Sequence, residues 1–140
     1  MVYLDTSAAV PLFVPEPASE PVSAWFAQSD EVVVSGDWIV TEFASALALK
    51  QRRRELTTAQ ADAVWSEFEM FCATGLRLVP VARSAFVSAA HATREAASGL
   101  RSGDSLHLAI ALQVGASSIA TVDATLAANA RKHGLGTVPF

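Results

Sequence analysis

Short apolar runs alternate with longer segments of helical spacing along the whole chain. The short runs predict strands at 2–4, 31–35, 77–81 and 117–122, with a short fifth strand at 137–138. The segments between them predict helices at 7–14, from 19 onward, and at 37–53, 57–74, 82–97, 101–112 and 124–133. Regular alternation of this kind favours a parallel sheet with helices on both faces and right-handed crossovers.

The pattern therefore predicts an α/β fold, a three-layer sandwich in which helices flank a central parallel sheet of four to five strands. We expect residues 1–140 to form a single domain, because the length suits one and the sequence has no repeats or linkers. The segment at 101–112 is apolar nearly all round, which predicts a buried helix. Helix ends are signalled by the capping-box pair Thr57 and Gln60 and by Gly134.

Composition narrows the class of protein. Hydrophobic residues make up 51% of the chain and the mean hydropathy is +0.33, which argues against disorder. No apolar run has the length of a membrane span and no basic region precedes the first apolar stretch, so we expect neither a membrane protein nor a signal peptide. The lone Cys72 can form no internal disulfide, fits a reducing cytoplasm and is expected to be a core side chain.

The formal net charge of −4 argues against a protein that holds nucleic acid by charge alone. It does not exclude a nuclease whose metal ions offset a local acidic site. The basic run from Lys50 to Arg54 is expected to be a solvated helix C-terminus, and the alternative interpretation is a contact to an RNA backbone.

Four acids lie near predicted strand ends or helix starts. Asp5 and Asp123 directly follow predicted strands, while Glu42 and Asp104 lie near the starts of predicted helices. In open parallel sheets the carboxyl edge is where ligands bind. The alternative for each acid is a structural one, because acids are favoured as helix N-caps and in first turns.

Glu42 and Asp104 fit the structural alternative poorly. Each lies on an otherwise apolar face of its predicted helix, and no Lys or Arg lies three or four residues further on to pair with it. A carboxylate in such a place needs compensation for lost hydration, and a bound cation would supply it. Oxygen ligands without a His or Cys cluster favour Mg²⁺ or Mn²⁺. The role of His107 has two interpretations. It is either a supporting group or general acid of the site, or a residue that only packs in the core.

Four motifs in chain order then resemble those of PIN-domain ribonucleases, and in particular the VapC-type toxins of bacterial toxin–antitoxin pairs. The motifs are Leu4–Ala8 (LDTSA), Thr41–Leu47 (TEFASAL), Gly103–Ala109 (GDSLHLA) and Thr121–Asp123 (TVD). The resemblance implies that the acids form one catalytic metal site, Asp5, Glu42, Asp104 and Asp123, with Asp5 and Asp104 as the principal ligands. It also implies supporting hydroxyls from Thr6, Ser7 and Thr121.

The resemblance further implies Mg²⁺-dependent cleavage of RNA, with Mn²⁺ as a substitute, in the cytoplasm. The implied partners are a cognate antitoxin and a second copy of the chain in a homodimer. Five aromatic residues on two predicted helices are either ordinary core or a groove for an antitoxin helix: Trp25, Phe26, Trp65, Phe68 and Phe71.

Three other interpretations compete. A receiver-like signalling domain would need a pair of acids after the first strand and a Lys after the last one, but Asp5 is flanked by Leu4 and Thr6. A haloacid-type phosphatase would need a second Asp where Ser7 stands. A PIN-like scaffold without catalysis, for RNA binding or protein interaction, would be favoured by the loss of an acid, and none of the four is missing.

Overall fold

The computed structural model describes all residues, 1–140, and has a five-stranded sheet in the order β3-β2-β1-β4-β5. All four pairings between neighbouring strands are parallel. The strands are β1 (Val2–Leu4), β2 (Val33–Gly36), β3 (Arg77–Val79), β4 (Ser118–Ala120) and β5 (Gly136–Thr137). The predicted parallel α/β fold is confirmed. A receiver-like domain is excluded by topology, because its strand order is 2-1-3-4-5.

Seven α-helices and two 3₁₀ turns connect the strands. They are α1 (Thr6–Ala9), η1 (Val10–Leu12), α2 (Ser19–Gln28), α3 (Trp38–Arg52), α4 (Thr58–Thr74), α5 (Arg83–Arg94), η2 (Ala96–Ser98), α6 (Ser102–Gln113) and α7 (Ala124–Lys132). The continuous helix predicted at 7–14 is wrong, because α1 gives way to a 3₁₀ turn at Val10. Pro11 lacks an N–H for an α-helical hydrogen bond, which explains the change.

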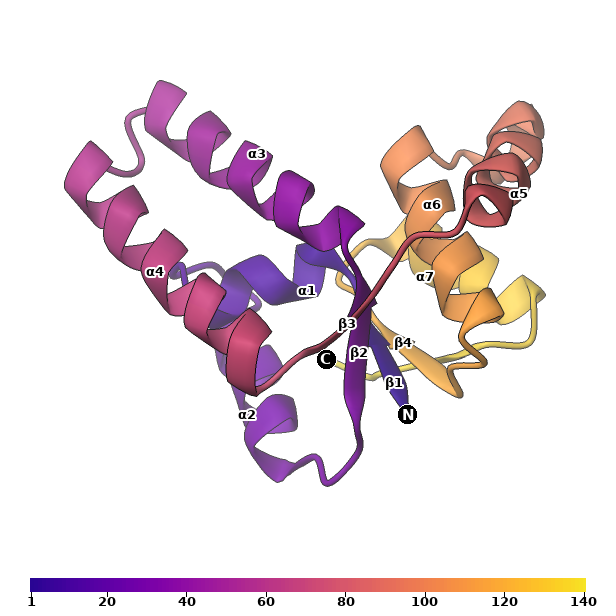
Figure 1. Ribbon diagram of the computed structural model, residues 1–140, viewed down its shortest axis with the longest axis horizontal. Helices are drawn as coiled ribbons and strands as arrows, with labels where there is room; N and C mark the ends of the chain where they lie inside the picture. The colour runs from indigo at the N-terminus through magenta and orange to yellow at the C-terminus, as the bar shows by residue number, and fades with distance from the viewer.

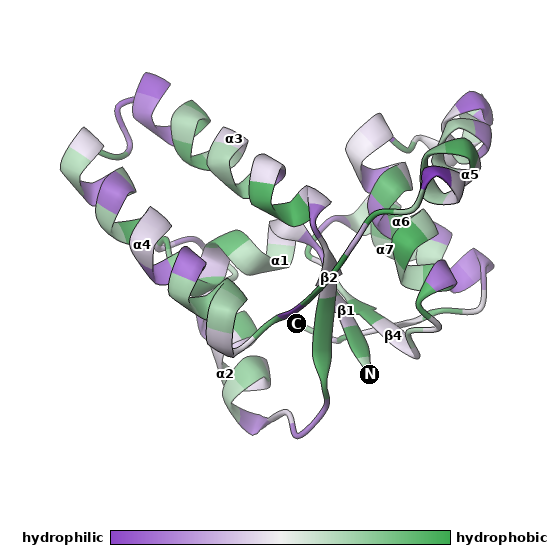
Figure 2. Ribbon diagram, viewed as in Figure 1, coloured by the Kyte–Doolittle hydropathy of each residue, from purple (hydrophilic) through white to green (hydrophobic).

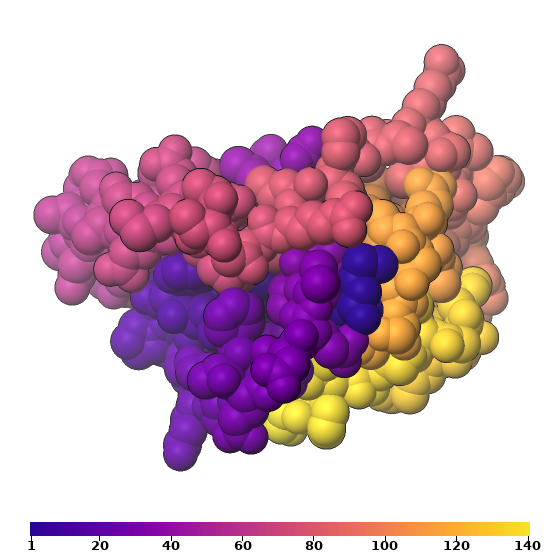
Figure 3. Space-filling view, turned by 60° about the horizontal axis from the view of Figure 1, so that its bottom comes forward, coloured from indigo at the N-terminus to yellow at the C-terminus, as the bar shows by residue number.

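Helices cover both faces of the sheet, as the three-layer prediction required. Helices α1 to α4 lie on one side, and α5, α6 and α7 lie on the other (Figure 1). Successive side chains of β1 point to opposite faces of the sheet. Val2 and Leu4 pack in the core beneath α1 to α4, and Tyr3 packs in the core beneath α5 to α7. The segment between α4 and α5, which contains β3, crosses from the side of α1 to α4 to the side of α5 to α7 (Figure 3).

The most buried helix is α6, as its sequence predicted. All residues from Ser105 to Ala111 are buried. A Cβ at Gly36, the last residue of β2, would lie 2.7 Å from Ile110 Cδ1, so glycine allows strand and helix to approach closely. In Figure 2 the strands β1 and β2 are hydrophobic, whereas hydrophilic residues gather where α3 meets α4. No helix combines the length and the apolarity that crossing a membrane requires.

Four predicted strands need corrected boundaries. The third strand ends at Val79 rather than at Val81, because Pro80 has no N–H to donate to the sheet. The second strand begins at Val33 rather than at Glu31, because the Glu31 carboxylate pairs with the N-terminal amine at 2.5 Å in the preceding loop. The fourth strand ends at Ala120, before the loop that carries the last acid. The fifth strand is shifted by one residue to Gly136–Thr137, because Gly136 N–H donates to Ser117 O at 3.0 Å.

Candidate functional site

The sheet topology brings two of the predicted acids to neighbouring positions. Asp5 directly follows β1 and caps α1, and Asp123 caps α7 in the loop after β4, the strand paired with β1. Glu42 lies in the second turn of α3, and Asp104 lies in the first turn of α6. We call these four carboxylates the acidic edge, because they come from the strand ends and helix starts at the carboxyl side of the sheet.

Two of the acids converge on a histidine. Ligand atoms of Asp5, Glu42 and His107 all lie within 4.8 Å of one another. His107 Nε2 is 2.7 Å from Glu42 Oε2 and 3.4 Å from Asp5 Oδ1, and the ring is fully buried. His107 is therefore part of the site and not only a packing residue.

The three predicted hydroxyls all contact these acids. Thr6 Oγ1 donates to Glu42 Oε2 at 2.7 Å. Thr121 Oγ1 donates to Asp5 Oδ2 at 2.8 Å, and the same oxygen accepts from Ser7 through both its backbone N–H and its hydroxyl. These donors hold one oxygen of each carboxylate in place.

Each carboxylate of the acidic edge accepts hydrogen bonds through one oxygen only. Asp104 Oδ2 accepts from the Arg101 backbone N–H at 3.1 Å, and Asp123 Oδ1 accepts from Leu126 N–H at 2.8 Å. The other oxygen of these two, and likewise Asp5 Oδ1 and Glu42 Oε1, accepts no hydrogen bond from the protein. Carboxylate oxygens of this kind are the ligands that a hard divalent cation prefers.

Asp104 and Asp123 lie outside the group formed by Asp5, Glu42 and His107. They nevertheless share its electrostatic field. Burial raises the pKa of the Asp104 carboxyl, and repulsion from Asp123, Asp5 and Glu42 raises it further, in spite of the Arg101 hydrogen bond. The pKa of one acid is therefore raised by proximity to the others.

Glu42 behaves in the opposite way. Burial alone would raise the pKa of its carboxyl, but the hydrogen bond and charge of His107, the hydrogen bond of Thr6 and the nearby indole N–H of Trp38 lower it below the usual range. Burial alone would lower the pKa of His107, but the surrounding carboxylates, Asp5 foremost, raise it. Glu42 is thus compensated by the protein, a possibility that the search for Lys or Arg along its own helix missed.

Two further residues of the site had no signal in the sequence. Tyr3 Oη is 2.8 Å from His107 Nδ1, on the side of the ring away from Glu42. Gly103 lies against Glu42, and a Cβ there would collide with Glu42 Oε1. Tyr3 reads as an ordinary strand residue and Gly103 as an ordinary helix start, so only the spatial packing identifies them.

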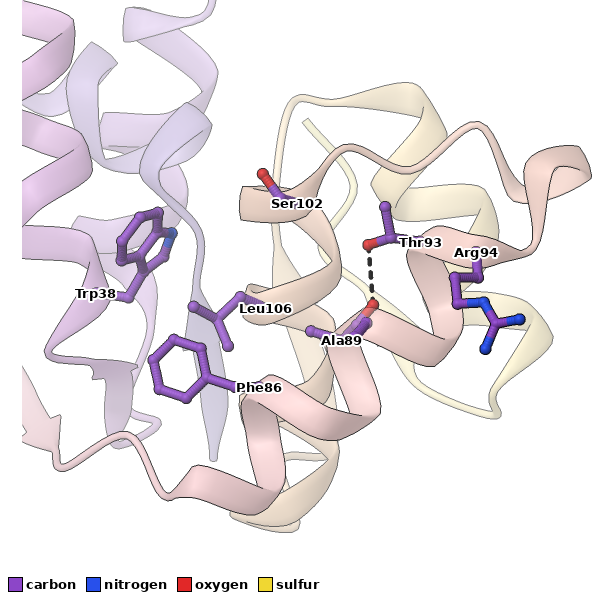
Figure 4. Close-up of a pocket in the computed structure, with 8 residues that line it drawn as sticks. Trp38, Phe86, Ala89, Thr93, Arg94, Ser102 and Leu106 are labelled. Carbon is purple, nitrogen blue, oxygen red and sulfur yellow. Dashed lines mark hydrogen bonds between the residues drawn. The ribbon is translucent and has the colours of Figure 1, made fainter.

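An apolar groove opens beside the acidic edge, between α3, α5 and α6 (Figure 4). Trp38, Phe86 and Leu106 face one another across it, Arg94 lies at its far end, and its volume is about 490 Å³. The Trp38 Nε1 atom is buried without a hydrogen-bond partner. We refer to this feature as the apolar groove. Two of its residues connect it to the acids: Trp38, whose indole lies beside the Glu42 carboxylate, and Ser102, which lies on the first turn of α6 with Asp104.

The five aromatic residues singled out in the sequence are not all buried. Phe68 is fully buried and stacks on Phe43 with ring centroids 3.8 Å apart. The remaining four are half-buried at the surface of the α2–α4 side: Trp25, Phe26, Trp65 and Phe71. Because four of the five aromatic side chains are only half-buried, the hypothesis of a partner that binds the α2–α4 side remains open to test.

Two smaller expectations are refined. Lys50 is not simply solvated, because it pairs with Glu16 at 2.5 Å and Glu55 at 3.4 Å, whereas Arg52, Arg53 and Arg54 are exposed. The free Cys72 is half-buried, and burial raises the pKa of its thiol, which does not suit a nucleophile.

The sequence was compared with family models and curated proteins, and the structure with solved structures. The family model described as "PIN domain" matches residues 2–132. The sarcin–ricin-loop-cleaving toxin VapC20 of Mycobacterium tuberculosis has a TM-score of 0.75 at 17% identity, over 92% of this chain and 95% of that chain. FitAcB of Neisseria gonorrhoeae has a TM-score of 0.70 at 19% identity, over 99% and 97%. VapBC2 of Rickettsia felis, bound to promoter DNA, has a TM-score of 0.65 at 12% identity, over 100% and 99%. At these identities the likeness shows the fold alone. No curated protein matches the sequence.

Proposed function

The chain belongs to the PIN domain family, and on that premise we propose that it is a metal-dependent endoribonuclease, the toxin of a type II toxin–antitoxin pair. The observation that carries the proposal is the acidic edge itself. Four carboxylates, each with one oxygen held by the protein and one left without a donor, lie at the sheet edge where ligands bind.

The proposed metal ligands and catalytic residues are Asp5, Glu42, Asp104 and Asp123. They would hold Mg²⁺, with Mn²⁺ as a substitute, through the oxygens that accept no protein hydrogen bond. When bound, the ion supplies charge neutralisation and Lewis-acid polarisation of the scissile phosphate. Thr6, Ser7 and Thr121 keep the acids oriented by donating to the opposite oxygens.

The carboxylates also have a role in proton transfer. Asp5 and Asp104 are the principal ligands, and the free oxygen of Glu42 or Asp123 either orients the attacking water and accepts its proton, as a general base does, or binds a second ion. In-line attack by water requires no 2′-hydroxyl, so the expected products carry a 5′-phosphate and a 3′-hydroxyl.

We further propose a protein partner of the antitoxin kind. Its amphipathic helix would cover the half-buried aromatics on the α2–α4 side, which include Trp25 and Phe71. The fold is shared with VapBC2 and FitAcB, which makes this partner class the natural one to test first. A homodimer and a cytoplasmic location complete the proposal, and a light-scattering measurement of mass tests the former.

The decisive experiment incubates the purified chain with a panel of structured RNAs, with and without Mg²⁺ or Mn²⁺, beside an Asp5→Asn control. Cleavage that requires the ion and is lost in the control supports the proposal. Binding of RNA without cleavage would instead favour a catalytically silent PIN-like scaffold. Cleavage that survives excess EDTA would contradict a metal-dependent mechanism.

A further inference from the structure

Both ring nitrogens of His107 are engaged by protein groups. Nε2 is 2.7 Å from Glu42 Oε2 and 3.0 Å from Thr6 Oγ1, while Nδ1 is 2.8 Å from Tyr3 Oη. His107 and Tyr3 are both fully buried, so water does not compete for these contacts. A ring with both nitrogens occupied is a poor candidate for a metal ligand, although it lies among the acids.

The direction of the hydrogen bonds follows from Tyr3. The Gly36 backbone N–H donates to Tyr3 Oη at 3.3 Å, which leaves the phenol proton for His107 Nδ1. A phenol keeps its proton at neutral pH, because the ordinary pKa of tyrosine is about 10. In a neutral imidazole, Nδ1 then accepts and the ring proton resides on Nε2, facing Glu42.

The same contact survives if the imidazole is charged. A protonated ring carries hydrogen on both nitrogens, so Nε2–H still donates to Glu42 Oε2 and Nδ1–H donates to Tyr3 Oη. Glu42 therefore receives a hydrogen bond from His107 in either state. Its second oxygen, Oε1, is left free, and Gly103 provides the space that it occupies.

We propose that Tyr3 and His107 form a buried positioning pair that holds Glu42 Oε2 and thereby presents Glu42 Oε1 to the metal and substrate. His107 acts through Glu42 and is not itself a ligand. The proposal rests on the function proposed above for Glu42, and it assigns the orientation of that carboxylate to two residues outside the four acids.

The first test measures the tautomer of His107 directly by long-range ¹H–¹⁵N NMR of the wild-type chain, without metal or RNA. We record the spectra at a pH above the titration of the ring and expect the neutral wild-type ring to carry its proton on Nε2. In Tyr3→Phe this proton should stay on Nε2, because Glu42 Oε2 still accepts it, and the ¹⁵N shift of Nδ1 should change because its hydrogen-bond donor is gone. A neutral wild-type ring protonated on Nδ1 would overturn the proposal, whether or not the protein cleaves RNA.

The second test compares Tyr3→Phe, His107→Gln and His107→Leu by Mn²⁺ calorimetry and by RNA cleavage kinetics. Loss of a group that orients a metal ligand weakens metal affinity or activity by about 10–100-fold. We expect this loss for His107→Leu, as weaker Mn²⁺ binding or a lower kcat with an unchanged KM for RNA. Partial recovery is expected in His107→Gln, whose amide N–H can reach Glu42.

Ser98→Ala is the matched control, because it also removes a buried hydroxyl that accepts from a backbone N–H, here that of Leu100, and the Ser98 hydroxyl lies outside the site, where it donates to Ala92 O. We expect it to lower the melting temperature without changing Mn²⁺ affinity or kcat. If Tyr3→Phe and His107→Leu match this control while the wild type binds Mn²⁺ and cleaves RNA, the positioning pair is wrong and the proposed function stands. If the wild type does neither, the proposed function fails, and the NMR measurement alone decides on the pair.

Discussion

The acidic edge and the apolar groove both take residues from the first two turns of α3 and from the start of α6, yet their buried polar atoms are treated differently. At the acidic edge, buried polar atoms are paired, as the bonds of Thr6, Thr121 and His107 show. In the apolar groove the buried Trp38 Nε1 has no partner, and Phe86 is 51% exposed. A satisfied hydrogen-bond network holds its atoms in one arrangement, whereas apolar packing tolerates substitutions that conserve volume.

This difference predicts where substitutions should matter. Removal of a charge or an orienting group at the acidic edge should change chemistry more than stability, because the acids repel one another. Removal of apolar surface from the groove should change stability slightly and chemistry not at all. The following predictions test that contrast from its strongest consequence to its weakest.

The largest effect is expected for Asp5→Asn and Asp104→Asn. Each amide keeps the shape of the acid but supplies no charge to hold a divalent cation, so RNA cleavage should be abolished while the fold persists. Cleavage assays in Mg²⁺ and Mn²⁺, with circular dichroism of each variant, provide the measurement. Full activity of either variant would show that the acidic edge is not a metal centre.

Much of the fold could be predicted because each element carried its own signal. The β-branched run at Val33 and Val34, the capping box at Thr57 and the glycine at Gly134 are local features, and the structure has β2, α4 and the end of α7 at these places. Boundaries moved by one or two residues where a distant contact decided them, as with the pairing of Glu31 and the N-terminal amine.

The four acids could be predicted from the sequence because the ends of strands and the starts of helices have local signals. The side chains that contact these acids could not be predicted. The Tyr3–His107 contact joins residues 104 positions apart, and Gly103 touches Glu42 only because α6 packs beside α3. The search for a partner of Glu42 along its own helix missed His107 for the same reason, since His107 comes from another helix.

A smaller effect is expected for Gly103→Ala. The new Cβ would collide with Glu42 Oε1 and force the carboxylate away from its present position, while its hydrogen-bond donors stay intact. We expect a loss of Mn²⁺ affinity or kcat of about 10–100-fold, as for other changes that misalign a ligand. Ser102→Ala, the preceding residue on the same turn, is the matched control and should bind Mn²⁺ like the wild type. Equal Mn²⁺ affinity of the Gly103 variant and this control would show that the position of Oε1 does not matter.

A change in melting temperature rather than in chemistry is expected from the pH dependence of the metal-free protein. The pKa of Asp104 is raised in the folded state by burial and by repulsion from the other acids, so the folded state binds this proton more tightly than the unfolded state. The contribution of Asp104 to stability is therefore greatest at low pH and is lost as pH rises through the raised pKa. Melting curves in EDTA between neutral and mildly acidic pH should show this gain on acidification.

Asp104→Asn provides the control for that measurement. It should melt higher than the wild type in EDTA at neutral pH, because one repelling charge is gone, and it should lose the response to Mg²⁺. Wild-type protein should be stabilised by Mg²⁺ through mass action, by about 2.7 kcal/mol at a concentration 100 times the Kd. A wild type indifferent to Mg²⁺, together with an unchanged melting temperature of the variant, would mean that the four acids do not act together.

The smallest effect is expected in the apolar groove, where Phe86→Ala removes a ring that is 51% exposed. Full burial of such a side chain contributes about 1.5–3 kcal/mol, so half-burial predicts a loss of about 1 kcal/mol. Phe43→Ala is the matched control on the opposite side of the sheet. Its ring is fully buried and stacked on Phe68, so a loss of about 3–5 kcal/mol is expected. Denaturant unfolding measures both losses.

Phe86→Ala should also keep wild-type Mn²⁺ affinity and RNA cleavage, because the ring contacts none of the four acids. A fall in cleavage at unchanged metal affinity would show that the apolar groove takes part in holding the RNA. The acidic edge and the apolar groove would then be two parts of one site, the first binding metal and the second binding RNA.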